Sequence, residues 1–214
     1  AVYDADRALA IRLLPTTTFA ERNWVHYKAK QALELRTLID TSQTDAYRLI
    51  YGESDGLPGI ITDRYGRFVV IKTYSKSIEQ LLEDVVWSLV KELKLKGIVW
   101  RKEKKLEPLW GDLPPPELTI NEHGLKFIAN LYEGQKTGLF LDQRENRQTL
   151  RGLAKEKTVL NLFSYNGGFS VYALAGGAKH VTSVDIAAAA NKDAERNISI
   201  NGFTKDQHQA VTAD

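Results

Sequence analysis

The sequence predicts a small α+β domain followed by the N-terminal part of a parallel, doubly wound α/β sheet. Up to residue 133, strand patterns are interrupted by a clear amphipathic helix, an order typical of α+β units. From about Gly134 onward, apolar strands and helices alternate, as they do in a parallel sheet. There, residues 159–170 read VLNLFSYNGGFS, and the next apolar strand ends on Asp185. A strand, a Gly-Gly turn, a helix and a following acid are typical of half of a nucleotide-type site.

The composition is that of an ordinary globular protein. Of 214 residues, 43% are hydrophobic and 26% charged, and the net charge of +2 does not indicate a nucleic-acid partner. The absence of cysteine excludes disulfides, a thiolate metal site and a cysteine nucleophile within these residues. No apolar run approaches the roughly 18 to 20 residues of a membrane span, and the N-terminus lacks a signal-peptide pattern. We expect a cytoplasmic protein without a membrane partner.

The two ends of the chain indicate a fragment of a longer protein. The sequence begins at Ala1, contains no methionine, and ends in HQAVTAD, which has the pattern of a strand approaching its C-terminal end.

Each element of the first part is expected from its own pattern. Residues 2–14 read as a short strand or hairpin ending at Pro15, and residues 21–39, which are rich in helix formers, are expected to form a helix. Ser77 is expected to cap a second helix, whose apolar residues at 78–93 recur at helical spacing. Alternation and flanking turn signals predict strands over 43–53, 59–63, 67–74, 97–101, 117–120 and 125–132.

The second part is expected to alternate regularly. A charged helix over 142–154 leads to a strand at 158–163, a helix at 168–175 and a strand at 180–185. A helix over 187–200 and the start of a third strand complete the order.

The Gly-Gly turn narrows the class of ligand. A dinucleotide fingerprint has the form G-x-G-x-x-G, and the corresponding letters SYNGG at 164–168 lack its first glycine. No Gly-Lys-Ser/Thr follows, which excludes a P-loop. An adenosyl ligand without a diphosphate suits the remaining turn and Asp185. The alternative is that the paired glycines only allow a helix and a strand to pack closely.

Three blocks in order carry a family resemblance: ESDGLPGIITDRYG at 53–66, GQKTGLFLDQRENR at 134–147 and VLNLFSYNGGFSVYALAGGAKHVTSVDI at 159–186. Over nearly all of 45–214 the chain resembles the class I S-adenosylmethionine-dependent RNA methyltransferases. Within them it is similar to the 23S rRNA cytosine-5 methyltransferases, which join a PUA-like RNA-binding domain, a small α+β domain and a Rossmann-like catalytic domain.

The resemblance implies three regions. Residues 1–40 would be the end of a PUA-like domain with a linker helix, and 41–133 the central α+β domain. Residues 134–214 would form an S-adenosylmethionine-binding Rossmann-like domain that is incomplete at its C-terminus.

The resemblance also assigns residues to the cofactor, S-adenosyl-L-methionine. Asp185 would bind the ribose hydroxyls, Ile186 would pack beside the adenine, and Asp214 would lie near the adenine amino group. Asn161 departs from the many members that have an acid there, and that charge is not needed to hold the turn. The loop under the methionine moiety and ribose would comprise Phe163, Ser164, Tyr165, Asn166, Gly167 and Gly168.

The segment 134–147 is a second dense polar region. The resemblance favours a role in closing over the cofactor or fixing the target nucleotide, with Gln143, Arg144 and Arg147 as candidates. The alternative is a solvated helix start with local pairs such as Asp142 with Asn146.

The run KLKGIVWRKEKK at 94–105 is a third candidate, because it combines six Lys or Arg residues with Trp100. Such a run binds phosphates and stacks bases where the indole is exposed. The alternative is a strand with solvated charges and Trp100 in the core. The four histidines show no ligand spacing, so no metal is expected.

The resemblance implies methyl transfer to ribosomal RNA at C5 of a cytosine. Such enzymes add a cysteine thiolate at C6 to activate carbon-5, and the target base leaves its stack. Because the chain has no cysteine, that residue and an Asp-Pro-Pro loop are expected beyond Asp214, and the catalytic residues here stay unknown.

Two other functions stay open at this point. One is a non-catalytic RNA- or cofactor-binding module of methyltransferase ancestry. The other is a nicotinamide-dependent oxidoreductase, which the missing first glycine disfavours. The oligomeric state, a homodimer included, is also open.

Overall fold

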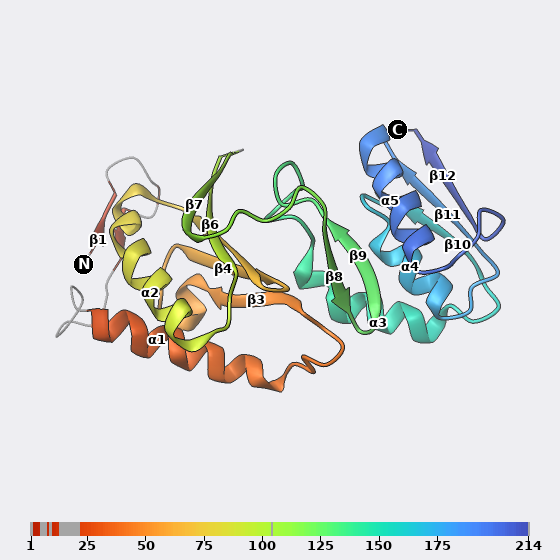
Figure 1. Cartoon of the computed structure of the whole chain (residues 1–214). Helices are drawn as coiled ribbons and strands as arrows, with labels where there is room; N and C mark the ends of the chain where they lie inside the picture. The colour runs from red at the N-terminus through yellow and green to blue at the C-terminus, as the bar shows by residue number, and fades with distance from the viewer. Residues whose placement is uncertain (1, 5–7, 9, 13–21, 104, 214) are drawn as a thin grey trace. The chain divides into compact units, whose positions relative to one another are not determined.

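The computed structural model describes residues 2–4, 8, 10–12, 22–103 and 105–213 (Figure 1). The chain divides into two compact units. The first comprises Ala1–Leu118 with Asn130–Leu139, and the second comprises Thr119–Ala129 with Phe140–Asp214. The boundary predicted near Gly134 therefore falls inside a segment that packs with the first unit.

A five-stranded mixed sheet forms the framework of the first unit. Its order is β3-β4-β5-β6-β7; β5 and β6 are parallel, and the other neighbours are antiparallel. The strands are β3 (Ala46–Tyr51), β4 (Ile60–Tyr65), β5 (Phe68–Thr73), β6 (Gly97–Lys102) and β7 (Lys105–Gly111). Four of them confirm predicted strands, and β7 was not predicted. A short antiparallel hairpin, β1 (Val2–Tyr3) with β2 (Ile11–Arg12), precedes the sheet; Pro15 lies outside the described residues.

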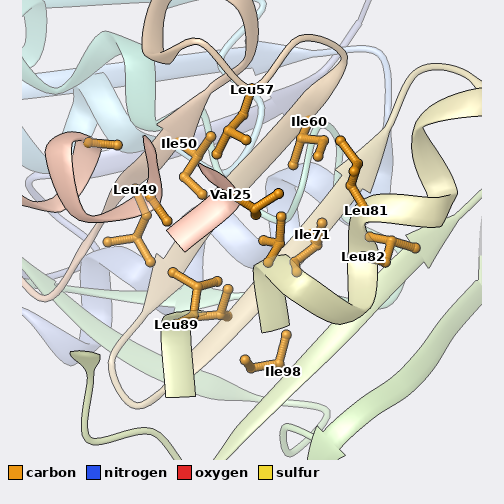
Figure 2. Packing of buried hydrophobic residues seen from close by; sticks show 14 of the residues in the cluster. Val25, Leu49, Ile50, Leu57, Ile60, Ile71, Leu81, Leu82, Leu89 and Ile98 are labelled. Carbon is orange, nitrogen blue, oxygen red and sulfur yellow. The ribbon is translucent and has the colours of Figure 1, made fainter. Parts of the chain in front are cut away.

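Helices α1 (Arg22–Leu35) and α2 (Leu82–Glu92) pack on one face of this sheet through the main hydrophobic core. Figure 2 shows Val25 of α1 and Leu89 of α2 close to the strand residues Leu49, Ile71 and Ile98. All five side chains are buried, so the apolar stripe of each helix explains its place.

The prediction that Ser77 caps α2 is wrong. Ser77 lies inside a 3₁₀ segment, Lys76–Leu81, and α2 begins only at Leu82. The Oγ atom of Ser77 is 2.9 Å from that of Ser75, so it is engaged by a neighbouring hydroxyl rather than by a helix N–H group.

The second unit is a three-stranded parallel sheet with helices. Its order is β10-β11-β12, with β10 (Thr158–Leu162), β11 (His180–Asp185) and β12 (His208–Thr212). The helices are α3 (Arg144–Leu153), α4 (Gly168–Ala175) and α5 (Ala188–Ile200). A 3₁₀ turn, Leu141–Gln143, leads into α3. The alternation predicted after residue 134 is confirmed, and with it the Rossmann-like half-sheet.

A separate hairpin, β8 (Leu118–Glu122) with β9 (Leu125–Ala129), also belongs to the second unit. It turns at His123-Gly124 as predicted. In the three-stranded sheet, β10 is an end strand within the described part of the chain, and its Leu160 and Leu162 are 62% and 55% exposed.

Candidate cofactor site

The loop after β10 has a strained backbone. Phe163 and Tyr165 have φ angles of 55° and 48°, and Gly167 has 72°. Side chains other than glycine seldom adopt this left-handed region. Such strain persists only where the surroundings hold it, and it concentrates at functional sites. Elsewhere among the described residues such non-glycine positions occur singly, whereas two lie within three residues here, which makes the loop 163–168 a candidate site.

Asp185 holds this loop from the end of β11. One carboxylate oxygen accepts the N–H group of Tyr165 at 2.8 Å, and the other accepts that of Ala187 at 2.9 Å. An ionised carboxylate offers about four acceptor positions, so two stay available for ribose hydroxyls. Asp185 therefore fixes the loop and could still bind a ligand.

The surroundings of the loop fit an adenosyl cofactor. The Ser164 side chain is buried, and its Oγ atom has no hydrogen-bond partner among the described residues. An unpaired buried hydroxyl is costly, and a polar ligand atom would relieve that cost. Phe163 and Ile186 are 90% and 68% exposed and could pack on the apolar parts of the ligand. Asp214, predicted to lie near the adenine, is outside the described residues.

Both glycines of the turn also serve packing. A Cβ atom on Gly167 would lie 2.8 Å from Cβ of Ala194 in α5, and one on Gly168 would lie 3.3 Å from Cδ of Arg147. Close packing, the alternative for this turn, therefore applies as well. Close packing and ligand binding are compatible functions of this turn, since one glycine-containing backbone can lie against α5 and also approach a ligand.

Asn166, which precedes the two glycines in the predicted loop, is buried. Its backbone oxygen accepts a hydrogen bond from Nδ2 of Asn197 at 2.9 Å.

The three lid candidates lie at the start of α3 but differ in environment. Gln143 Oε1 accepts a bond from Asn146 Nδ2 at 2.9 Å, and Arg144 Nε lies 2.9 Å from Glu145. Arg147 is buried, and its guanidinium donates to the Glu122 carboxylate at 2.8 and 2.7 Å and to the Phe140 carbonyl at 3.0 Å. All three guanidinium nitrogens of Arg147 thus face protein acceptors.

The preceding residues of that polar segment are anchored in the first unit. Thr137 donates to Asp63 at 2.6 Å, and the Tyr65 hydroxyl, 2.8 Å from Thr137 Oγ1, accepts the N–H group of Leu139. Since the Thr137 proton goes to Asp63, Tyr65 donates to Thr137. Burial and the nearby Asp63 raise the pKa of Tyr65, which keeps this hydroxyl protonated.

The basic run 94–105 does not form a stacking surface around Trp100. Trp100 is buried, its Nε1 atom is 3.2 Å from Thr73 Oγ1, and Lys102 lies over its ring. Arg101 is also buried and donates to the carbonyls of Leu131 and Gly134 at 2.9 and 2.8 Å. Trp100 therefore lies in the core, as the alternative predicted, whereas Arg101 is buried and not solvated as that alternative expected.

A buried polar chain crosses the second unit beneath the loop. Asn161 Nδ2 donates to Ser170 Oγ at 2.9 Å, Ser170 Oγ is 2.7 Å from Ser183 Oγ, and Ser183 Oγ is 2.8 Å from Nε2 of His208. Burial lowers the pKa of His208, so the ring is held neutral. Asn161 therefore supplies a neutral donor to this chain.

Asn191 of α5 lies beside the candidate site and was not predicted from the sequence. Its Nδ2 atom lies 3.1 Å from the carbonyls of Asp185 and Val211 and 2.9 Å from Thr212 Oγ1. It thereby joins the ends of β11 and β12, next to Ile186. An asparagine in the first turn of a helix is too common to predict this role.

Two negative observations concern the described residues alone. They contain no group of three or more His, Cys, Asp or Glu side chains placed to hold a metal ion. Nor does any helix among them have the length and apolarity to span a membrane.

Comparison with known sequences matches residues 66–211 to the S-adenosylmethionine-dependent methyltransferases. Ribosomal RNA large subunit methyltransferase I of Alteromonas mediterranea is 39% identical over 197 residues, covering 87% of this chain and 50% of that protein. Ribosomal RNA large subunit methyltransferase of Deinococcus radiodurans is 36% identical over 232 residues, covering 100% of this chain and 57% of that protein. The chain therefore spans about half the length of these relatives.

Solved structures give the same result. A SAM-dependent methyltransferase from Streptococcus mutans has a TM-score of 0.86 at 30% identity, covering 94% of this chain and 54% of that one. A methyltransferase complexed with SAH matches equally well, with a TM-score of 0.86. The matched residues 66–211 include the loop 163–168 and Asp185. The chain therefore belongs to the S-adenosylmethionine-dependent methyltransferase family, whose cofactor is S-adenosyl-L-methionine.

Proposed function

We propose that this chain is the cofactor-binding part of an enzyme that methylates ribosomal RNA of the large subunit, at C5 of a cytosine in 23S rRNA. The observation that carries the proposal is the strained loop 163–168 fixed by Asp185, in a chain whose relatives are named ribosomal RNA large subunit methyltransferases. The choice of C5 rests on the resemblance of the three sequence blocks. Residues 1–40 would then end a PUA-like domain, and the protein would act in the cytoplasm.

Within this proposal four residues of the loop and of the end of β11 have separate tasks. Asp185 accepts the ribose hydroxyls with its two remaining acceptor positions, and Ser164 pairs its buried hydroxyl with a polar atom of the cofactor. Phe163 and Ile186 cover the apolar parts of the cofactor and exclude water. The cofactor supplies the methyl group when bound.

The target chemistry places one demand on the rest of the protein. Carbon-5 of cytosine is a poor nucleophile until a thiolate has added at C6. These 214 residues contain no cysteine, so the proposal requires a cysteine from outside them. Gln143 and Arg144 are proposed to close over the cofactor or the target nucleotide, and Arg147 to support them from its buried pair with Glu122.

Calorimetric titration with S-adenosylhomocysteine and NAD tests the cofactor assignment. We expect S-adenosylhomocysteine to bind and NAD to give no response. Binding of NAD without binding of S-adenosylhomocysteine would reject the assignment. Transfer of labelled methyl groups by the complete protein to protein-free 23S rRNA tests the substrate. Cofactor binding without transfer to any rRNA would favour a non-catalytic binding module instead.

A further inference from the structure

The β8–β9 hairpin is attached to α5 by two asparagines one helical turn apart. Asn201 Oδ1 accepts the N–H group of Lys126 at 2.9 Å, and its Nδ2 donates to the Lys126 carbonyl at 2.7 Å. Asn197 Oδ1 accepts the N–H group of Ile128 at 2.8 Å. Both residues thus pair with the free backbone edge of β9.

Asn197 makes a further contact that Asn201 does not. Its Nδ2 atom donates to the backbone carbonyl of Asn166, in the cofactor loop, at 2.9 Å. Asn197 is completely buried, so no water can replace either bond. One side chain therefore connects the hairpin with the loop that follows β10.

A second connection runs through the buried ion pair. Glu122 of the hairpin holds the Arg147 guanidinium in two hydrogen bonds. The Cδ atom of Arg147 approaches the position of a Cβ on Gly168 to 3.3 Å. Tyr172 of α4 donates to the Glu122 carbonyl at 3.2 Å, so the same residue also fixes the helix that begins at the loop.

The loop needs such support because of its conformation. Phe163 and Tyr165 adopt left-handed φ angles that cost free energy. Asp185 holds the N–H side of Tyr165, and Asn197 holds the carbonyl of the next residue. Asp185 belongs to β11 and Asn197 to α5, so side chains of two different elements hold the peptide groups on either side of the one that joins Tyr165 to Asn166, and surroundings of this kind keep a strained conformation in place.

We propose that the β8–β9 hairpin is a brace for the cofactor loop, and that Asn197 and Glu122 are positioning residues for the cofactor. The expected effect on cofactor affinity rests on the proposed function. The bracing itself rests on contacts within the second unit. It makes the hairpin a support of the cofactor site, although the hairpin precedes the cofactor strand in the sequence and is connected to the loop through Asn197 and Arg147.

The test compares Asn197→Ala with Asn201→Ala in the complete protein. Both variants weaken hairpin attachment, and only the first removes the bond to the loop. We expect Asn197→Ala to speed amide exchange of residues 163–168 at least about fivefold, and to raise the dissociation constant of S-adenosylhomocysteine by a similar factor. Asn201→Ala should change both by less than about twofold. Equal effects of the two variants, or an unchanged loop in Asn197→Ala, would overturn the brace.

A second variant covers the case in which Asn197→Ala does not fold. Asn197→Asp keeps an acceptor for Ile128 and, when ionised, turns a carboxylate oxygen toward the Asn166 carbonyl in place of the amide donor. Measured at about pH 8, where the carboxylate form is favoured, it should loosen the loop at least as much as Asn197→Ala, and normal exchange and affinity in this variant would refute the proposal. If the unmodified protein does not bind S-adenosylhomocysteine, the proposed function fails, and the exchange comparison still decides on the brace.

Discussion

Replacing Asp185 with alanine should destabilise the protein even in the absence of cofactor. If the Asp185 carboxylate only bound ribose, its removal would not change the stability of the unliganded protein. Here, however, it accepts N–H groups from Tyr165 and Ala187 at 2.8 and 2.9 Å. Asp185→Ala leaves both donors without this acceptor and removes a restraint on a loop with unfavourable φ angles.

The size of the effect follows from these two bonds. A hydrogen bond to a charged group contributes about 1.5 to 3 kcal/mol. Because Asp185 is half-buried, water can replace part of each bond, and we expect a total loss of about 1 to 3 kcal/mol. For a chain of this length that corresponds to a drop in Tm of roughly 2 to 12 °C.

Thermal unfolding of the unliganded protein, followed by titration with S-adenosylhomocysteine, separates the two roles. Asp206→Ala is the matched control, since this acid of the same unit is exposed, and its Tm should change by less than about 2 °C. A normal Tm with lost binding would show that Asp185 acts on the ligand alone. A normal Tm with normal binding would refute both roles.

Three further predictions concern stability. Gly167→Ala should cost about 2 to 4 kcal/mol in urea unfolding, because its φ is 72° and the new Cβ would lie 2.8 Å from a side-chain carbon of α5; Gly152→Ala, exposed in α3 with open space around it, should instead stabilise by about 0.5 to 1 kcal/mol. The lowered pKa of His208 means that the unfolded state binds more protons as the pH falls through about 6.5, so stability should decrease below that pH, and less steeply in His208→Gln; equal slopes would contradict a buried neutral ring. Arg101→Ala should cost about 2 to 4 kcal/mol, because three backbone carbonyls lose their donor; Lys102→Ala, half-exposed on the same strand and in contact with the Trp100 ring, should cost about 1 kcal/mol or less, and similar values for the two would show that the carbonyl contacts contribute little.

The sequence predicted elements best where a local pattern was strong. Helix α4 and strand β11 have the bounds expected from their apolar runs, because glycines and a charged residue end them. Strand β7 was missed because its residues 105–111 contain a proline and a glycine, continue a run of charged residues and lie at the end of the sheet. It is a strand because it pairs with β6, with a register shift next to Val99, and no local sequence pattern predicts this pairing.

The site could be predicted only in part, for the same reason. A glycine turn and a following acid identified the loop 163–168 and Asp185, since both depend on neighbouring residues along the chain. The contacts of Asn197 with Ile128 and Asn166 span 69 and 31 positions, and spacing in one sequence cannot reveal them. Arg147 was expected near the cofactor or the target nucleotide because segment 134–147 resembles a block of the family, and its buried partner, Glu122, lies 25 residues away.

The exposed flank of β10 has a practical consequence for work with this chain. An end strand offers unpaired N–H and C=O groups, and here it also carries the exposed side chains of Leu160 and Leu162. Apolar strand edges of this kind are templates for pairing with a second molecule. A preparation of these 214 residues alone should therefore self-associate as its concentration rises. Replacing Leu160 by lysine should keep it dispersed, because charged residues are how natural sheets protect an edge.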